Sequence, residues 1–548
     1  MASPETSAPD VELTPARTDP TPVASPAVGA ALLASFARSG IPELLKLRLL
    51  KLAALTLLLV TVGTLAFQYK LCVLDPDIWW HLKVGDWIVE HHAVPHTGIL
   101  SRTAANRPWI AYSWGYEILI SRAYAWFGLL GIGLYGTLLT LMVAYAVYWM
   151  LRRVSGRFWV AWIGAAVTCS AFLFDGMPRP FFFSIALFAV TLTLLLDANR
   201  TGRIQRLYWL PLVFCLWANL HIQFIYGLFL LGLFVAVNVV LRLSSAFRVT
   251  RDFLLAPSLP LAPLIVLSAG CLAATLLGPY TYHPYQVVYE YSKAKFTYSV
   301  IIELQPLAFR DFTNFVELFL TAAAFFAVGW KRKLDLFQLA LLTAASVIAY
   351  RTMRDAWFIC LPAAACIAEA LAVQSKSAGA AADTPQNRFA EKWFAESWLE
   401  KLGIAAAVVV LLALMSNATD FTQRGLDRVI SSQYPVNAVN FLRRNPVPGP
   451  LYNNLNWGGF LMWYMPQYPV AIDGRNDLYG DQFDKIFFNS QNGEKSYQTD
   501  PYLNEAGVVL LFSDLPLAKL LTVDPRFQLI YRDPIATVFA RRSQSTEY

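Results

Sequence analysis

The sequence predicts a polytopic α-helical membrane protein with a small α/β domain at its C-terminal end. Of its 548 residues, 56% are hydrophobic and only 15% are charged, whereas soluble proteins carry about 25% charged residues. The apolar residues form runs that approach the roughly 20 helical residues needed to cross a bilayer. Residues 418–548 instead alternate short strand-like and helical runs, which is typical of a small α/β domain.

The membrane-spanning region is expected to cover residues 49–417, with outer loops at 68–123 and 278–314. Residues 1–48 are rich in Pro, Ala, Ser and Thr, and we expect them to form a disordered cytoplasmic tail because they contain too few bulky apolar residues to pack. Eleven spans are predicted: 49–67, 124–151, 158–175, 181–197, 207–220, 223–241, 258–277, 315–330, 335–350, 356–373 and 402–417.

Basic residues predict the orientation of these spans. Four alternate short loops hold Arg152, Arg153 and Arg157; Arg200, Arg203 and Arg206; Arg242, Arg248 and Arg251; and Lys331, Arg332 and Lys333. Cytoplasmic loops carry an excess of Lys and Arg, so these four loops and the N-terminus are expected inside and residues 418–548 outside. The net charge of +7 therefore reflects sidedness. Nucleic-acid binding is not expected, because the basic clusters are separated by apolar spans.

The C-terminal domain is expected to contain strands at 451–464, 469–472, 508–512, 527–531 and 537–540, and a helix at 436–443. Asp473, Arg475 and Asp477 follow the second of these strands. Asp-Gly and Asn-Asp pairs form turns, and Asp473 can pair locally with Arg475. A role of these three residues in acceptor recognition or in closure over the bundle is the alternative.

The densest polar segment follows the first span and contains Asp75, Asp77 and His81. Two carboxylates at this spacing can share a hard divalent cation such as Mg or Mn, or divide the roles of base and ligand. The alternative is a helix N-cap followed by interfacial Trp residues. A zinc site formed by His81, His91, His92 and His96 is disfavoured, because the adjacent His91 and His92 side chains point apart and tetrahedral ligands must converge.

Further candidates lie at predicted outer ends of spans. Glu117 is a carboxylate within an aromatic segment that also reads as an amphipathic surface helix. His81, Arg179, His221, Arg351 and Arg354 are candidate phosphate ligands, because guanidinium groups bind phosphate in a bidentate manner. Each could instead be a boundary anchor. The middles of the spans lack ionisable residues, which disfavours an ion-coupled transporter.

These motifs resemble a known family. The matching segments are 75–82, 108–109, 113–117, 219–221, 351–355 and 456–479. Together they resemble a large group of bacterial polytopic membrane proteins. That group looks like the GT-C glycosyltransferase superfamily, which includes oligosaccharyltransferase catalytic subunits, protein O-mannosyltransferases and aminoarabinose transferases.

The resemblance implies a GT-C-like bundle in the inner (cytoplasmic) membrane that transfers a sugar, with inversion, from a polyprenyl-phosphate donor to an acceptor on the extracytoplasmic face. It implies that Asp75 or Asp77 acts as base or metal ligand. Glu117 and Glu303 are possible second carboxylates. The Arg and His candidates would stabilise the leaving phosphate. The alternative is a non-catalytic membrane scaffold, or a subunit of a larger membrane assembly, that has kept the bundle.

Overall fold

The computed structural model describes residues 43–68, 71–172, 177, 179–244, 253–255, 259–331, 333–378 and 422–542, with a few single positions between 402 and 413. Most of the predicted tail and of the predicted span 402–417 lies outside these residues. Residues 1–53 and 54–548 form two compact units. The helix α2 (Glu43–Gln68) begins in the first, and everything below concerns the second.

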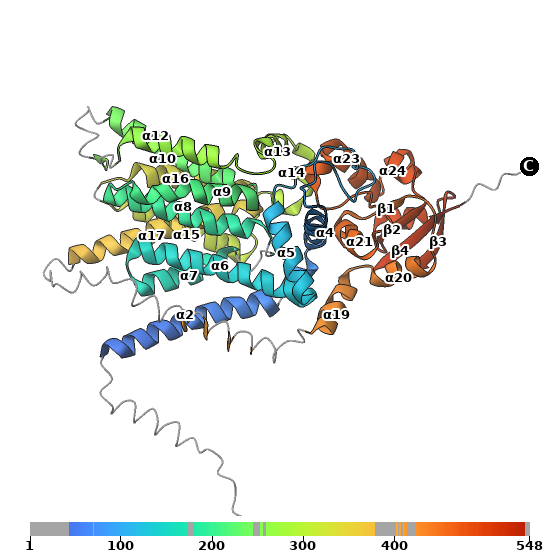
Figure 1. The fold of residues 1–548 in the computed structure, drawn as a ribbon, viewed down its shortest axis with the longest axis horizontal. Helices are drawn as coiled ribbons and strands as arrows, with labels where there is room; N and C mark the ends of the chain where they lie inside the picture. Colours follow the sequence, from blue (N-terminus) through green and yellow to red (C-terminus); the bar gives the residue numbers. More distant parts are fainter. Residues whose placement is uncertain are drawn as a thin grey trace, which may run out of the picture. The chain divides into compact units, whose positions relative to one another are not determined.

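Apolar helices make up the bundle of the second unit (Figure 1). Their bounds are α6 Leu129–Ser155, α7 Phe158–Phe172, α8 Phe181–Thr201, α9 Leu210–Leu220, α10 Phe224–Ser244, α12 Leu261–Ala274, α15 Phe312–Gly329, α16 Leu336–Arg351 and α17 Trp357–Ala378. Among the described residues, five helices are long and apolar enough to cross a membrane, and α7, α12 and α16 are shorter apolar helices. The chain is thus an integral membrane protein, whereas the predicted count of eleven spans is not confirmed.

The predicted span 124–151 is wrong at its start. Gly128 has a left-handed φ of 61° and separates α5 (Trp114–Phe127) from α6. Glycine adopts this conformation without a Cβ penalty. The predicted span 207–220 consists of a short 3₁₀ turn, Gln205–Trp209, followed by α9. Its proline, Pro211, lies in the first turn, where no helical hydrogen bond is lost.

Short helices occupy the two predicted outer loops. They are α3 Leu71–Leu74, α4 Pro76–His91 and α5 in the first loop, and α13 His283–Tyr291, α14 Lys295–Val300 and the 3₁₀ turn Ile302–Leu304 in the second. A further 3₁₀ turn, Met353–Asp355, joins α16 to α17.

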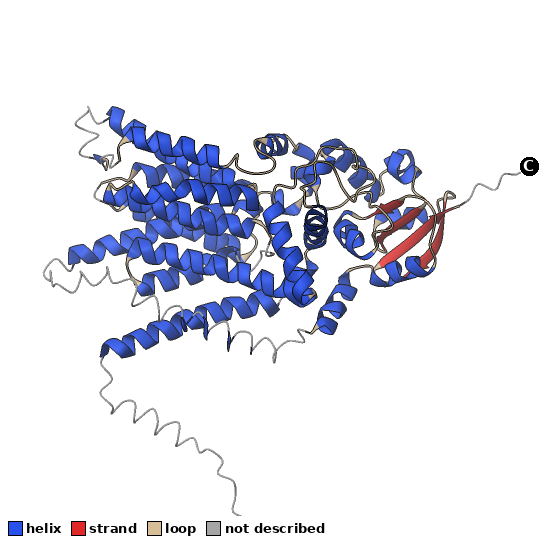
Figure 2. Ribbon diagram, viewed as in Figure 1, coloured by secondary structure: helices blue, strands red, loops and turns tan. Residues whose placement is uncertain are grey.

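The C-terminal part combines a four-stranded sheet with helices, and Figure 2 shows the strands together in this part of the chain. The strands are β1 Leu451–Asn453, β2 Val508–Phe512, β3 Phe527–Arg532 and β4 Ala536–Arg541. The sheet order is β1-β2-β4-β3, with β1 parallel to β2 (Leu451 opposite Val508) and the other pairs antiparallel. The helices are α19 Gln423–Gln433, α20 Val436–Arg444, α21 Leu455–Tyr464, α22 Asn476–Tyr479, α23 Asp481–Gln491, α24 Pro501–Asn504 and α25 Pro516–Leu521, with a 3₁₀ turn at Lys495–Thr499.

Two of the predicted strands are wrong. The range 451–464 holds only three strand residues before α21 begins, because the Asn454 side chain caps this helix by accepting from the Asn456 N–H at 2.9 Å. The range 469–472 is not a strand, and Val470 makes only an isolated bridge to Ser101. Apolar continuity alone does not distinguish a buried helix from a buried strand.

The helix α4 packs against the C-terminal part. Trp79 is fully buried and contacts the rings of Tyr434, Phe460 and Tyr464 edge-on at centroid distances of 5.5–5.9 Å. A Cβ on Gly459 of α21 would lie 2.7 Å from the Pro76 carbonyl oxygen, so the glycine permits close approach of the two helices. The loop before the bundle is therefore held by aromatic packing against residues nearly 400 positions away.

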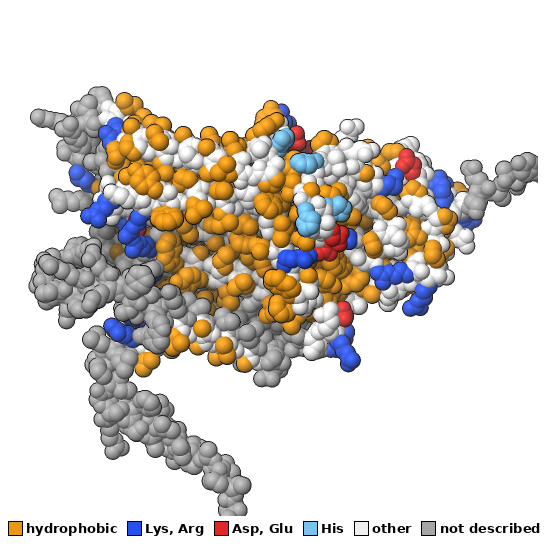
Figure 3. All heavy atoms as spheres, in the orientation of Figure 1, with side chains coloured by type: hydrophobic (Ala, Val, Ile, Leu, Met, Phe, Trp, Pro, Cys, Tyr) orange, Lys and Arg blue, Asp and Glu red, His pale blue; other side chains and the backbone are white. Residues whose placement is uncertain are grey.

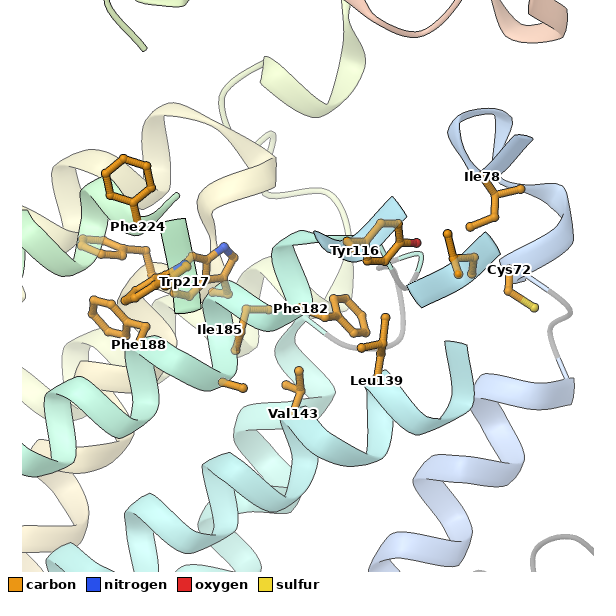
Figure 4. Packing of buried hydrophobic residues seen from close by; sticks show 14 of the residues in the cluster. Cys72, Ile78, Tyr116, Leu139, Val143, Phe182, Ile185, Phe188, Trp217 and Phe224 are labelled. Carbon is orange, nitrogen blue, oxygen red and sulfur yellow. The ribbon is translucent and has the colours of Figure 1, made fainter. Parts of the chain in front are cut away.

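Buried apolar side chains connect the bundle to α4 and α5. Figure 4 shows this packing from Phe224 and Trp217 through Phe182 and Leu139 to Tyr116. At the other end of the bundle Asp197 accepts hydrogen bonds from Arg153, Arg200 and Arg206 within 3.0 Å. On the face drawn in Figure 3, Lys and Arg side chains lie at one end of the apolar surface, and histidines lie beside carboxylates and further basic side chains toward the other end.

Candidate functional site

A cavity of about 340 Å³ lies where the end of the bundle, α4, the second outer loop and the C-terminal part meet. Its charged and titratable lining residues are Asp77, His81, Tyr112, Arg179, His221, Tyr291, Glu303, Arg354, Arg475 and Asp477. These residues come from six regions of the sequence: the first outer loop, the segment before α8, the residue after α9, the second outer loop, the turn after α16 and the segment at the start of α22. The predicted candidates at Asp77, His81, Arg179, His221, Arg354, Arg475 and Asp477 are therefore brought together by the fold.

The start of α4 separates the two aspartates of the D-x-D motif. Asp75 is the N-cap, and its Oδ1 accepts from the Asp77 N–H at 3.0 Å. Both Asp75 oxygens also accept from the Arg179 guanidinium, at 2.7 and 2.8 Å. Asp75 is buried and does not line the cavity, so its structural task is to start the helix and orient Arg179.

Asp77 faces the cavity. Its Oδ1 accepts from Trp80 Nε1 at 3.1 Å, and its Oδ2 lies 3.2 Å from Arg179 Nη1. Burial raises the pKa of Asp77 to about 6, and the Arg179 charge opposes this rise. The carboxylate is ionised at neutral pH yet has a pKa close to that pH, as a general base requires.

Arg179 is shared by three carboxylates. In addition to Asp75 and Asp77 it contacts Glu303 Oε1 at 3.0 Å. These neighbours raise the pKa of the guanidinium against the effect of its burial. Its predicted role as a phosphate ligand remains a prediction, because in this arrangement its donors are directed at carboxylates.

Two other guanidinium groups in the cavity retain free donors. None of the described residues forms a hydrogen bond or ion pair with Arg354, which lies half-buried in the turn after α16. Arg475 is held by Asp473 through Nε and Nη2, both at 2.8 Å, while its buried Nη1 has no partner among the described residues. Unpaired buried donors are costly, and an anionic ligand would satisfy them.

Asp477 lies beside Arg475 at the C-terminal side of the cavity. It accepts a hydrogen bond from Trp109 Nε1 at 3.1 Å, and the Arg475 guanidinium lies over the Trp109 ring at 4.6 Å. Burial raises the pKa of Asp477 to about 6, against the Arg475 charge. The carboxylates of Asp77 and Asp477 thus both titrate just below neutral pH.

Two histidines line the cavity, and in each the Nδ1 atom contacts a buried polar side chain. His81 Nδ1 lies 3.2 Å from Glu117 Oε1, and His221 Nδ1 lies 2.8 Å from Ser184 Oγ. Burial, aided by neighbouring arginines, lowers the pKa of both imidazoles well below the ordinary value. Burial raises the pKa of Glu117 to about 8. Glu117 itself does not line the cavity.

The remaining predicted residues lie outside the cavity. Arg351 is exposed, with its guanidinium 5.9 Å from the Tyr298 ring centre. Asp473 is fully buried beneath Arg475 and also accepts from Tyr479 Oη at 2.5 Å. The local pairing of Asp473 with Arg475 is therefore present, and it serves to orient a cavity residue.

Sequence reasoning missed the aromatic and amide lining. Tyr112 and Tyr291 line the cavity with Asn454 and Asn456. The sequence offers no separate signal for Tyr291, because the tyrosines of residues 278–314 are equally typical of an interfacial aromatic belt. Asn454 and Asn456 could not be recognised as neighbours of a site, because the sequence predicts a strand over 451–464.

The predicted Mg or Mn site does not fit the residues as they are arranged. Both oxygens of Asp75 receive hydrogen bonds from Arg179, and Asp77 is also paired with that guanidinium. Across the described ranges, no group of three His, Cys, Asp or Glu side chains is placed to hold a metal ion. We therefore derive no step through a metal.

Comparisons with known proteins give structural matches alone. No family model and no curated protein matches the chain. The solved structures that it resembles include the Archaeoglobus fulgidus oligosaccharyltransferase tethered to an acceptor peptide (TM-score 0.46, 13% identity, 89% of this chain and 74% of that one). They also include ArnT from Cupriavidus metallidurans bound to undecaprenyl phosphate, with a TM-score of 0.42, 14% identity, and 89% of this chain and 98% of that one covered. ArnT in the apo state matches with a TM-score of 0.42, 14% identity, and 88% of this chain and 97% of that one covered. At these TM-scores and identities no family, activity or residue role follows for this chain.

Proposed function

We propose that this protein is a GT-C-type glycosyltransferase that moves a sugar, with inversion, from a polyprenyl-phosphate donor to an acceptor at the extracytoplasmic face of the inner membrane. The observation that carries the proposal is one cavity lined by the Asp77 carboxylate and by two guanidinium groups. The described residues provide no hydrogen-bond or ion-pair partner for Arg354, and the buried Nη1 of Arg475 has none. A base and an anion site within one cavity are what this transfer needs.

Asp77 is the proposed base. It takes the proton of the acceptor nucleophile as that atom bonds to the anomeric carbon from the face opposite the phosphate. The bond between the anomeric carbon and the phosphate oxygen breaks, and its electron pair leaves with the polyprenyl phosphate. Arg354 and Arg475 are the proposed stabilisers of that developing negative charge. Asp75 supports the reaction only by holding Arg179.

An apolar path beside the cavity supports a lipid-linked donor. A second cavity of about 210 Å³ shares Arg179, Glu303 and Arg354 with the first and extends between α7, α15 and α17. On neighbouring residues of α7 and α15 lies an open groove lined only by apolar side chains, including Val167, Phe315 and Phe319. A phosphate at Arg354 would leave its prenyl chain next to this groove.

The scaffold alternative is less well supported. The buried Nη1 of Arg475 has no partner among the described residues and lies near Asp477, a carboxylate of raised pKa. Such a group costs stability, which a protein without catalysis would not need to accept. The convergence of Asp77, Arg354 and His221 in one cavity favours the transferase.

Binding of undecaprenyl phosphate to the purified chain in lipid nanodiscs tests the proposal. Arg354→Gln removes a charged donor, and the loss of a charge-assisted hydrogen bond is expected to weaken binding about tenfold or more. Arg351→Gln is the matched control, since this arginine lies in the same segment but outside the cavity. The proposal fails if both variants bind like the wild type, or if undecaprenol, which lacks the phosphate, binds equally well.

A further inference from the structure

The two cavity histidines share a feature that the transfer scheme above does not use. Each presents one ring nitrogen to a buried group behind it, and in the described part of the chain no group hydrogen-bonds the other nitrogen, Nε2. His81 and His221 are 4% and 2% exposed, so both are fixed in the wall. Which nitrogen carries the proton decides whether each histidine offers a donor or an acceptor to a ligand.

The hydrogen-bond donors and acceptors around Ser184 determine the tautomer of His221. The Trp217 indole can only donate, and its Nε1 donates to Ser184 Oγ at 2.7 Å. Among the described residues, His221 Nδ1 at 2.8 Å is the acceptor that remains for the Ser184 hydroxyl proton. Because Nδ1 accepts, the proton of the neutral imidazole resides on Nε2.

Glu117 determines the tautomer of His81 in the same direction. Its Oε1 faces His81 Nδ1, while its buried Oε2 has no partner among the described residues. An ionised carboxylate with one oxygen buried and unpaired is strongly disfavoured, whereas a carboxylic acid leaves only a carbonyl oxygen unpaired. The neutral acid donates to Nδ1 and leaves the proton of His81 on Nε2. Burial raises the pKa of Glu117 to about 8, which agrees with this assignment.

Close packing keeps Glu117 in place. A Cβ on Gly85, one helical turn after His81, would lie 2.0 Å from the Glu117 carbonyl oxygen, so α4 and α5 touch at this point. The His81 ring also lies against Trp80 at a tilt of 33° and a centroid distance of 3.5 Å, and it contacts Tyr116 edge-on at 5.0 Å. The imidazole therefore has little freedom to rotate and exchange its two nitrogens.

We propose that His81 and His221 are a pair of neutral Nε2–H donors aimed at the phosphate of the lipid-linked substrate, and that Glu117, Ser184 and Trp217 are positioning residues that set this state. The inference rests on the proposed function for the identity of the ligand, but not for the tautomers. It leaves Asp77 as the base, because neither histidine has a lone pair available to the cavity.

Nitrogen-15 spectra of the full chain in liposomes at pH 7, with labelled histidine, test the tautomers without any substrate. His81→Gln and His221→Gln each identify one signal by its loss. The wild type is expected to show Nε2–H for both residues. Ser184→Ala is expected to leave His221 as a mixture of tautomers and to weaken undecaprenyl phosphate binding about three- to tenfold, while Ser184→Thr restores both. Ser346→Ala is the control, because this serine of α16 lies outside the cavity lining and donates to the Leu342 carbonyl of its own helix.

Each result has a distinct meaning. An Nδ1–H signal from either histidine in the wild type overturns the inference. Nε2–H signals together with unchanged lipid binding in Ser184→Ala overturn the donor role. Failure of the wild type to bind undecaprenyl phosphate, with both Nε2–H signals present, overturns the proposed function and leaves the positioning residues standing.

Discussion

At the scale of single residues, the two aspartates of the D-x-D motif have different environments, although they are only two positions apart in the sequence. Asp75 is a helix cap and a partner of Arg179, whereas Asp77 faces the cavity and has a pKa raised to about 6. The N-cap interpretation is therefore confirmed for Asp75, whereas the functional interpretation stays a prediction for Asp77. The sequence could not separate them, because the partner of Asp75 lies 104 positions away.

The raised pKa of Asp77 predicts a pH dependence for the transfer. A base must be unprotonated, so the rate is expected to fall as the pH drops through about 6 and to level off above it. Asp77→Asn is expected to lower the rate by about 10²–10⁴-fold. The measurement is the amount of polyprenyl-phosphate sugar that accumulates, by mass spectrometry, in cells that contain only the variant.

Asp75→Asn provides the comparison for this prediction. Asparagine still caps α4 but cannot pair with Arg179 in the same way, so we expect a smaller loss of transfer together with a lower thermal stability. A rate that does not change between pH 5 and 8, or full activity in both asparagine variants, would show that Asp77 is not the base.

At the scale of elements, the site depends on how α4 meets the loop before α22. A Cβ on Gly474 would lie 1.9 Å from Asp77 Oδ1 and 3.1 Å from Trp80 Nε1. Gly474→Ala is therefore expected to displace the Asp77 carboxylate and to lower transfer at least about tenfold, since general-base catalysis depends on position. The thermal midpoint is expected to fall only slightly, because the clash is relieved by moving one short side chain.

Gly270→Ala is the control for that substitution. Gly270 lies within α12, and a Cβ there meets nothing within 4 Å, so the change is expected to leave transfer intact. If Gly474→Ala transfers sugar at the rate of the wild type, Asp77 does not need the position in which the structure holds it.

The helices of the bundle and of the C-terminal part show which elements an apolar pattern predicts and which it does not. The apolar runs predicted most helices of the bundle, because a span needs only length and apolarity. They did not predict the break at Gly128, which depends on a single left-handed residue. They also misassigned α21, whose apolar sequence reads equally well as a buried strand until the Asn454 cap is considered. The cavity required tertiary contacts that no local pattern contains.

At the scale of the whole molecule, charge is distributed between the two ends of the bundle of the second unit. Arg153, Arg200 and Arg206 meet at Asp197 at one end, and the cavity lies at the other. Arg179 at the cavity end contributes little to the charge of that side, because Asp75, Asp77 and Glu303 accompany it. The basic end is the one that the positive-inside rule assigns to the cytoplasm.

This arrangement predicts which side of the membrane each end occupies. Lys519 and Arg203 are exposed, the first in α25 of the C-terminal part and the second just after α8 at the basic end. In spheroplasts, a membrane-impermeant maleimide is expected to label Lys519→Cys directly and Arg203→Cys only after permeabilisation. The wild type gives the background, since its cysteines are buried or partly buried. The reverse labelling order would move the cavity to the cytoplasmic face, where Asp77 and Arg354 would meet a different set of acceptors.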